Sequence, residues 1–417
     1  DSPARSRFRT GAPARAALMT GRYPHRTGSI DTLEGRGLDR LHLDETTLAD
    51  ILQSHDYQTG LIGKWHNGAL DPRYHPNARG FDEFVGFRGG WNPYYKWRLD
   101  YNKSIQHGDG RYLTDVFTEE AIAFINRHHR ESFFLQLAYN APHFPLEAPD
   151  AIAQKYTAQG FSLGVSLIYA MIEIMDAGVQ RILDTLQARG IADNTIVIFT
   201  SDNGPAFDDW NGFSQQRYNY GFNGHKGNTY EGGIRVPLII RWADGLESGI
   251  RRDEMVHYTD WLPTLLTMVG IDIPDDLRLD GNNVLPVLRG ESGQINPVRF
   301  WQWNRYTPIA TCNAAMRDGD WKLVRPQIPE AMHLSDQDIA VDHAIKHFPE
   351  QFDDIVRDPE PPRTIPDAPS ALLFNIADDP FEQNNLAEQN PAKVDTMLSA
   401  LERWFADVEQ DRMREQA

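Results

Sequence analysis

The stretch Gly11–Arg22, with the sequence GAPARAALMTGR, is the most informative segment of this 417-residue chain. Within it, Ala16–Met19 form a short apolar run that predicts a helix. Arg15 adds a guanidinium, which stays charged at any physiological pH. The first position, Gly11, has no side chain and therefore offers no atom for chemistry. The stretch therefore combines a short predicted helix, one permanently charged side chain at Arg15 and no side chain at Gly11.

Size and charge restrict the classes of protein to consider. The chain is long enough for one large domain and a smaller one. Its 41 basic and 59 acidic residues give a formal charge of −18, which argues against a nucleic-acid partner but not against a small anion. No stretch approaches 18 apolar residues, so no membrane span is expected. Cys312 is the only cysteine, which excludes an intrachain disulfide and leaves the redox compartment open.

Strand and helix patterns alternate through the first 296 residues. Residues 71–110, rich in Gly, Pro, Asn and aromatic residues, are expected to be loop-like. The predicted strands are Tyr57–Gly63, Phe133–Tyr139, Thr195–Thr200 and Val236–Trp242; the predicted helices are Thr46–Ser54, Leu113–His128, a stripe from Ile168 to Leu186 that includes Ile172, and Trp261–Val269. Phe133–Tyr139 is a continuous apolar run and is predicted to be buried. This alternation predicts an α/β fold, a mostly parallel sheet between helices.

The pattern changes after about residue 296. Short strands are predicted at Arg299–Trp303, Trp321–Val324 and Leu372–Ile376, with a terminal amphipathic helix at Val394–Val408. Residues 326–370 are Pro- and Asp-rich and are predicted to form a long loop. We therefore expect a catalytic domain at 1–296 and a smaller α+β domain with antiparallel strands at 297–417.

Several polar residues follow predicted strands, where ligands bind in open α/β sheets. They are Lys64 and His66, His143, Asp202 and Asn203, joined by Lys226 in a Gly-rich loop and by Arg15. Each alone has an ordinary structural explanation, as a histidine that hydrogen-bonds, a turn, or a solvated cation. Together they form a plausible pocket for a bidentate anion near a hard metal ion.

Six ordered stretches resemble the sulfatase family. Gly11–Arg22 is similar to its signature C/S-x-P-x-R-x-x-L-x-T-G-R, and Tyr57–His66 to its G-Y-x-T-x-x-x-G-K-W-H signature, with Asp56 replacing the leading Gly. The others are Ala141–Pro145 (P-H-x-P), Ser201–Gly204 (the metal-binding strand end), Lys226–Pro237 (K-G-x-x-x-E-G-G-x-R-V-P) and Leu373–Ile376 with Asp379–Glu382 (L-Y-D-L…D-P-x-E). The resemblance covers nearly the whole chain.

The resemblance implies an alkaline-phosphatase-like fold and hydrolysis of sulfate monoesters of aryl alcohols or carbohydrates. In the family a Cys or Ser at the position of Gly11 becomes formylglycine, whose hydrate attacks sulfur beside one Ca²⁺ ion. By analogy, Asp202 and Asn203 would bind the metal and Arg15 would hold the nucleophile. Lys64, His143 and Lys226 would bind sulfate oxygens. His66 would help the hydrate return to the aldehyde, and His143 or Lys226 would protonate the leaving alcohol.

Two departures from the family pattern stand out. Gly11 cannot become formylglycine, whether through mutation, gene decay or a modified residue written as a plain one. The family also places an Asp-Asp pair on a strand upstream of the nucleophile motif, in the middle of the sheet. We expect the catalytic domain to be N-terminally truncated and to lack that strand, which would leave backbone groups unpaired on both neighbours.

Other interpretations remain open. A phosphonate or phosphodiester hydrolase of the same superfamily would use similar ligands, and a non-catalytic sulfate-ester-binding protein would keep the cations without the nucleophile. The aromatic segment Gly90–Trp97 either stacks on sugar rings or packs its own loop. The expected partner is a small-molecule or glycan sulfate ester. The resemblance implies a periplasmic or extracellular location, and the oligomeric state is left open.

Overall fold

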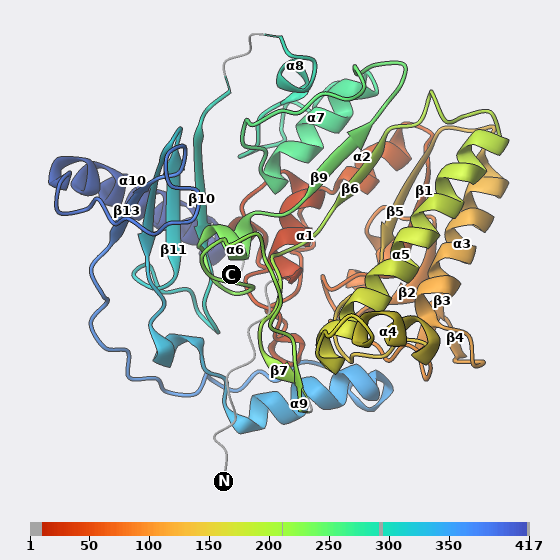
Figure 1. Cartoon of the computed structure of the whole chain (residues 1–417), viewed down its shortest axis with the longest axis horizontal. Coiled ribbons are helices and arrows are strands. Elements are labelled where there is room, and N and C mark those ends of the chain that lie inside the picture. Colours follow the sequence, from red (N-terminus) through yellow and green to blue (C-terminus); the bar gives the residue numbers. More distant parts are fainter. Residues whose placement is uncertain (1–10, 211, 292–294, 415–417) are drawn as a thin grey trace.

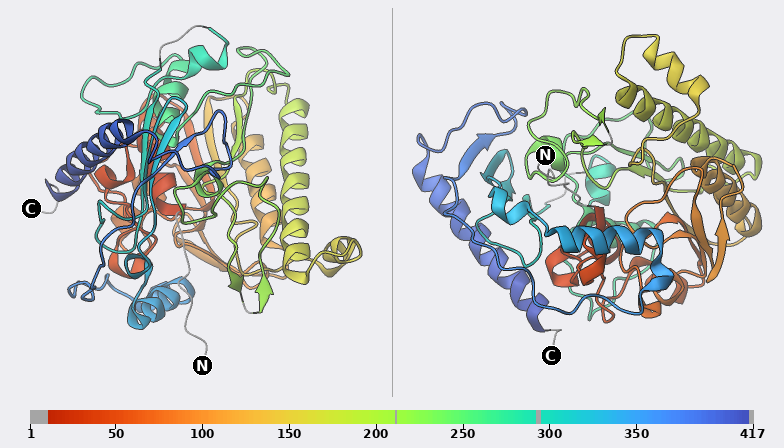
Figure 2. Two further views of the ribbon diagram at one scale, coloured as in Figure 1. Left: turned by 60° about the vertical axis from the view of Figure 1, so that its left-hand side comes forward. Right: turned by 90° about the horizontal axis from the view of Figure 1, so that it is seen from below.

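The computed structural model describes residues 11–210, 212–291 and 295–414. Helices flank a mixed sheet in the larger part of the molecule, and a separate antiparallel sheet with the long helix α10 (Pro391–Arg414) forms the smaller part (Figures 1 and 2). This is the alkaline-phosphatase-like arrangement predicted from the sequence.

The main sheet has the strand order β4-β3-β2-β1-β5. Its strands are β1 (Gln58–Lys64), β2 (Glu83–Phe87), β3 (Arg98–Tyr101), β4 (Ser104–His107) and β5 (Phe133–Ala138). β1 pairs in parallel with β2 and β5, whereas β3 and β4 are antiparallel additions at one edge. The prediction that residues 71–110 are loop-like missed β2, β3 and β4, which lie there between turns and loops. These strands are short and interrupted by Gly, Pro and Asn, which hides their periodicity.

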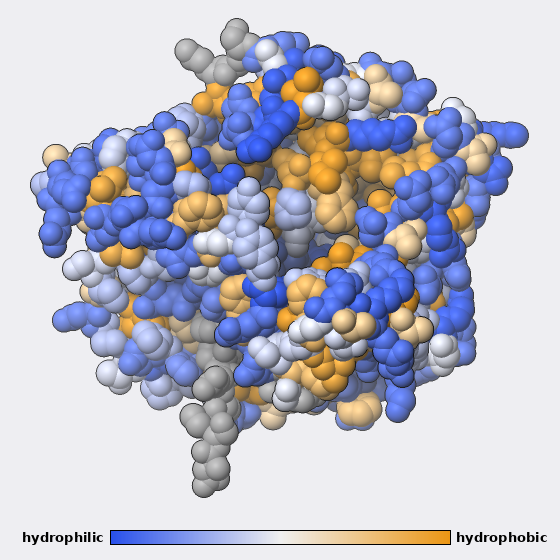
Figure 3. All heavy atoms as spheres, viewed as in Figure 1, coloured by the Kyte–Doolittle hydropathy of each residue, from blue (hydrophilic) through white to orange (hydrophobic). Residues whose placement is uncertain are grey.

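A two-stranded sheet lies apart from the main sheet. β6 (Val197–Thr200) pairs antiparallel with β9 (Leu238–Arg241), so the prediction of a mostly parallel sheet overstates the parallel pairing. β5 was predicted to be buried, but five of its six residues are half-buried, because β1 is its only partner among the described strands. Figure 3 shows apolar residues gathered in a hollow between α5 and β9. Ile239, a residue of β9, is 63% exposed.

The helices of the larger part are α1 (Gly11–Thr20), α2 (Leu48–Ser54), α3 (Leu113–His128), α4 (Asp150–Thr157), α5 (Leu163–Ala188), α6 (Glu231–Ile234), α7 (Trp261–Met268) and α8 (Leu285–Leu288). The five helices predicted for this part are present, as α1, α2, α3, α5 and α7, whereas α4, α6 and α8 were not predicted. α2 begins with a capping box in which Thr47 and Asp50 exchange hydrogen bonds. The predicted stripe of α5 is buried at Ile168 and Met171 but is wrong at Ile172, which is exposed.

α5 is also the one described helix long and apolar enough to cross a membrane by length and composition. This corrects the expectation that no stretch of the chain reaches that limit. Its buried side belongs to the largest apolar cluster, with Phe117 and Phe124 of α3. A helix in a protein core passes the same test, so the finding shows no membrane span.

The smaller part contains the sheet β10-β11-β12-β13, with all neighbours antiparallel. Its strands are β10 (Val298–Gln302), β11 (Ala314–Asp318), β12 (Trp321–Arg325) and β13 (Leu372–Asn375). One face packs against α10 through Leu401 and Trp404, and Tyr23 joins the same apolar cluster. The ring of Trp404 stacks on Phe300 at 5.0 Å between centroids. Tyr23 thereby ties the segment after α1 to the C-terminal sheet.

Residues 326–370 are not simply a long loop, because they contain the twelve-residue helix α9 (Asp336–His347). Ser335 caps it by accepting a hydrogen bond from the backbone of Asp338. Among the described residues, the short 3₁₀ helices and remaining strands are η1 (Pro24–Thr27), η2 (Glu34–Arg36), η3 (Pro72–Tyr74), η4 (Pro76–Ala78), β7 (Asp209–Trp210), β8 (Phe213–Ser214), η5 (Tyr258–Asp260), η6 (Pro329–Met332) and η7 (Pro349–Gln351).

Candidate active site

The fold brings Gly11, Lys64 and Asp202 to one place. Gly11 begins α1, Lys64 ends β1, and Asp202 comes two residues after β6. A Cβ atom built on Gly11 would lie 2.7 Å from Oδ2 of Asp202 and 3.5 Å from Nζ of Lys64. Residue 11 therefore faces both a carboxylate and an ammonium group. The carboxylate already occupies the space into which a side chain at this position would grow.

Arg15 joins these groups from the next turn of α1. Its Nε and Nη2 atoms donate to Oδ2 of Asp202 at 3.2 and 3.1 Å, and its Nη1 atom donates to the carbonyl of Lys64 at 2.8 Å. The guanidinium thus connects the ends of β1 and β6 across the start of α1. Such a paired, charge-assisted contact fixes the orientation of the carboxylate.

The charges around Asp202 show that Lys226 belongs to the same cluster. Burial alone would raise the pKa of this carboxyl, but the positive charges of Arg15, Lys64 and Lys226 outweigh it and lower the pKa to about 2. Lys226 is itself buried, and its backbone N–H donates to the carbonyl of Pro205 at 2.8 Å. Three cations around one carboxylate leave a net positive site that suits an anionic ligand.

The Gly-rich block after Lys226 explains how the loop is placed. A Cβ on Gly204 would lie 1.9 Å from the carbonyl oxygen of Gly232, so only glycine permits this approach of the two backbones. The N–H of Gly204 donates to the carbonyl of Gly233 at 2.9 Å. The block therefore presses the Lys226 loop onto the segment that carries Asp202.

Glu231 of the same block reaches a buried ion cluster in the C-terminal sheet. Nζ of Lys322 lies 2.8 Å from Oε1 of Glu231 and 2.8 Å from Oε1 of Glu382, and all three side chains are buried. Oε2 of Glu382 also accepts a hydrogen bond from the backbone of Glu231 at 2.7 Å. The fifth and sixth family-like stretches thus meet through Lys322, a residue in neither of them that the sequence analysis missed.

Asp202 and Asn203, the two predicted metal ligands, lie next to each other and carry side-chain oxygen atoms. The side-chain Nδ2 of Asn203 donates to the carbonyl of Gly204 at 2.9 Å, but its Oδ1 is buried without a hydrogen-bond partner. A buried oxygen of this kind is suited to a cation, and Asp202 adjoins it. The described residues contain no group of three His, Cys, Asp or Glu side chains that could hold a metal. Asp202 and Asn203 therefore offer oxygen atoms of the kind that a hard cation prefers, and within the described residues they do not by themselves make a metal site.

His66 and His143 lie at the ends of neighbouring strands. Gly63 of β1 pairs with Ala138 of β5 in parallel register, so both histidines follow the same edge of the sheet. His66 is buried with a left-handed φ of 61°, and its Nε2 is 3.6 Å from Oε1 of Glu34. The Nδ1 of His143 is 2.9 Å from the carbonyl of Phe144, and Tyr94 donates to the carbonyl of His143 at 2.9 Å. His66 thus adjoins a carboxylate that the sequence analysis did not single out.

The aromatic segment Gly90–Trp97 packs its own loop. Trp91, Tyr94 and Trp97 are buried, and Tyr94 and Trp97 belong to the main apolar cluster. Only Tyr95 is partly exposed among the rings of this segment, at 37%. The structure therefore favours packing over stacking on a sugar.

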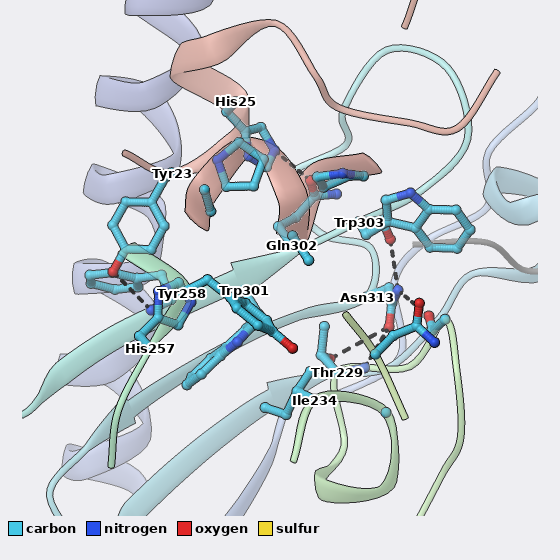
Figure 4. Close-up of a pocket in the computed structure, with 18 of the residues that line it drawn as sticks. Tyr23, His25, Thr229, Ile234, His257, Tyr258, Trp301, Gln302, Trp303 and Asn313 are labelled. Carbon is cyan, nitrogen blue, oxygen red and sulfur yellow. Dashed lines mark hydrogen bonds between the residues drawn. The ribbon is translucent and has the colours of Figure 1, made fainter. Parts of the chain in front are cut away.

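An apolar pocket of about 100 Å³ lies on the other side of Asp202 and Asn203, between α1 and the C-terminal sheet (Figure 4). Aromatic side chains such as Tyr23 and Trp301 line it. At its polar end, Nδ2 of Asn313 donates to the carbonyl of Gly227 at 2.8 Å. This contact anchors the loop next to Lys226 to the smaller part of the molecule.

The comparisons with known proteins agree with this geometry. The family model "Sulfatase" matches residues 5–271. The chain belongs to the sulfatase family. A second model, described as "N-sulphoglucosamine sulphohydrolase, C-terminal", matches residues 220–357 of this sulfatase-family chain.

Relatives of this family member include both bacterial and animal proteins. It is 30% identical to the uncharacterized sulfatase YdeN of Escherichia coli K12, over 97% of this chain and 73% of that protein. It is 31% identical to human N-acetylgalactosamine-6-sulfatase, over 66% of this chain and 56% of that protein. A crystal structure of Ps i-CgsB in complex with k-i-k-neocarrahexaose superimposes with a TM-score of 0.78 at 28% identity, covering 96% of this chain and 83% of that one.

Proposed function

We propose that this chain binds the sulfate monoester of a sugar or aryl alcohol at the cluster of Arg15, Lys64 and Lys226. One observation carries the proposal: all three cations act on the same carboxylate, Asp202, directly beside the first residue of α1. A tetrahedral dianion or monoanion gains charge-assisted hydrogen bonds in such a site. The oligosaccharide complex of the superimposed protein supports a glycan as the alcohol component.

In the proposed reaction, Lys64 and Lys226 bind sulfate oxygens and stabilise the charge that develops on them as the S–O bond breaks. Arg15 holds Asp202 in a fixed orientation while it links β1 and β6. His143 donates a proton to the oxygen of the departing alcohol, and His66 takes up a proton at the nucleophile position. When bound, Ca²⁺ would supply a Lewis acid that neutralises sulfate oxygens, held by Asp202 and Asn203 together with further oxygen donors.

Formylglycine cannot form at Gly11, so turnover requires a precursor side chain at this position. We propose that a Gly11→Cys variant, produced in a host that installs formylglycine, hydrolyses p-nitrophenyl sulfate. The matched control is Gly11→Ala, which adds the Cβ without the thiol. Hydrolysis by the cysteine variant alone supports the sulfatase function. Faster cleavage of bis(p-nitrophenyl) phosphate than of the sulfate ester would instead favour the phosphodiesterase alternative.

A second function is favoured by Gly11 itself. With Asp202 filling the space beside residue 11, the chain keeps the anion-binding cations and lacks a nucleophile. It would then bind sulfate esters without cleaving them. Titration calorimetry with galactose 6-sulfate and with galactose separates the two cases: sulfate-dependent binding, combined with no turnover by modified Gly11→Cys, supports the binding function.

A further inference from the structure

Glu34 is a buried carboxylate that the proposed chemistry does not use. Its side chain comes from η2, and its Oε1 accepts a hydrogen bond from the backbone of Gly90 at 2.6 Å. The same oxygen lies 3.6 Å from Nε2 of His66 and 3.1 Å from Nζ of Lys346. The side chain of Glu34 is 0% exposed. Burying a carboxylate in this way costs folding free energy unless a cation or hydrogen-bond donor offsets the lost hydration.

The cation that compensates Glu34 is supplied by α9. Nζ of Lys346 also lies 2.5 Å from Oδ2 of Asp342, one turn earlier in the helix. Oδ1 of Asp342 in turn accepts a hydrogen bond from the backbone N–H of Glu34 at 2.9 Å. α9 therefore holds both the backbone and the side chain of Glu34. This two-point attachment fixes the carboxylate more firmly than a single ion pair between flexible side chains.

His66 is held against this carboxylate by its own backbone and by Gly90. The left-handed φ of His66 is unusual for a residue with a side chain, and such strain is found where a side chain must be aimed. A Cβ on Gly90 would lie 2.9 Å from Cε1 of His66 and 3.1 Å from Oε1 of Glu34. The absence of a side chain at Gly90 therefore lets the imidazole and the carboxylate share this space.

We propose that Glu34 is a positioning residue for His66, and that Lys346 of α9 holds it in place. At 3.6 Å the carboxylate is too far from Nε2 for a hydrogen bond, but its negative charge favours a proton on this nearest ring nitrogen, which leaves Nδ1 as the nitrogen that takes up a proton. Burial raises the pKa of Glu34 to about 7 against the opposing charge of Lys346, which is consistent with a carboxylate that depends on its partners. This inference rests on the proposed function only for the role of His66, which takes up a proton at the nucleophile position.

The tautomer of His66 tests the proposal without any sulfate ester. We would record long-range ¹H–¹⁵N spectra of the imidazoles in the full chain, with the His66 signals assigned by their loss in His66→Asn. We expect one Nε2-protonated tautomer in the parent chain and loss of that single signature in Glu34→Gln. The matched control is Glu350→Gln. Glu350 and Glu34 both line a second pocket of the molecule, which Lys346 also lines, but Glu350 pairs with Arg98.

Glu34→Asp provides the second variant if Glu34→Gln does not fold. It keeps the buried charge but draws the carboxylate back from His66 by one methylene, so the tautomer signature should again be lost. A folded Glu34 variant with unchanged His66 signals would overturn the proposal, as would an equal change in Glu350→Gln. Because no turnover is measured, failure of the sulfate-ester function would leave these results unaffected.

Discussion

Oδ2 of Asp202 lies 2.7 Å from the point where a side chain on Gly11 would begin. Real Cβ atoms essentially never come within 3.0 Å of another atom, so any substitution at residue 11 must move the carboxylate. The carboxylate is not free to move, because Arg15 donates two hydrogen bonds to the same oxygen. Residue 11, Asp202 and Arg15 therefore form one coupled unit.

The first prediction concerns this coupling. Gly11→Ala should lower the free energy of unfolding by about 1–3 kcal/mol, the usual cost of inserting a methyl group into a filled site. In the double variant with Asp202→Ala, which removes the obstructing oxygen, the effect of the alanine should largely disappear. Urea unfolding of the four proteins in this cycle measures the coupling. Strictly additive effects of the two substitutions would contradict the prediction.

The second prediction concerns the cations. Lys64→Met and Lys226→Met should each weaken the binding of a sulfated monosaccharide roughly tenfold to a hundredfold, because each removes a charged hydrogen-bond donor. Calorimetry at constant ionic strength measures the change. Lys393→Met serves as the control, since Lys393 lies over the ring of Trp321 in the smaller part of the molecule. Equal effects of all three substitutions would point to general electrostatics instead of a site.

The third prediction concerns Lys322, which lies between Glu231 and Glu382. Lys322→Met leaves two buried carboxylates without their cation, and we expect a loss of about 3–5 kcal/mol in the free energy of unfolding. The triple variant with Glu231→Gln and Glu382→Gln should recover most of that loss. Chemical unfolding of both variants gives the comparison. A triple variant no more stable than the single one would show that the charges are not the cause.

Much of the site could be predicted because its residues follow strands. Lys64, His143 and Asp202 come at or just after the ends of runs whose apolar character is visible along the chain. Parallel pairing brings the ends of β1 and β5 together, whereas Arg15 links Asp202, which follows β6, to Lys64. Arg15 and Lys226 were identified by motifs, and the structure places both beside Asp202.

Other features could not be predicted because they depend on tertiary contacts. Glu34 lies in no family-like stretch, and its importance arises from Lys346, more than 300 residues later in the chain. α9 is flanked by Pro and Asp residues, which are typical of loops. A tertiary contact stabilises the helix, because Lys346 of α9 pairs with Glu34 of η2. β5 has the composition of a buried strand, but burial depends on which strands pair with it.

The fourth prediction follows from the pKa of His257. Burial, helped by the charge of Arg299, lowers this pKa from 6.5 to about 3. Between these values the unfolded chain binds a proton that the folded chain does not. Stability from His257 is therefore fully present above about pH 6.5 and is lost as the pH falls toward 3.

In the parent chain, Nδ1 of His257 accepts a hydrogen bond from the backbone N–H of Thr259 at 3.2 Å. His257→Asn keeps a side-chain acceptor for this N–H. The variant should be less stable than the parent chain at neutral pH but should show a weaker dependence on pH. Its slope should be smaller by as much as about 1.4 kcal/mol per pH unit between about pH 4 and pH 6. Unfolding in urea across this range measures both slopes, and parallel curves for the two proteins would rule out a contribution from His257.

The last prediction concerns the apolar hollow between α5 and β9 (Figure 3). Unpaired strand edges that carry exposed apolar side chains promote association between chains. Ile239 of β9 is 63% exposed, so Ile239→Lys should reduce both the binding of a hydrophobic dye and the light scattering of concentrated solutions. Ile250→Lys is the matched control, because Ile250 is 44% exposed but lies outside the described strands. If both lysine variants reduced dye binding equally, the added charge would be responsible; a reduction confined to Ile239→Lys would locate the adhesive surface at the open edge of this sheet.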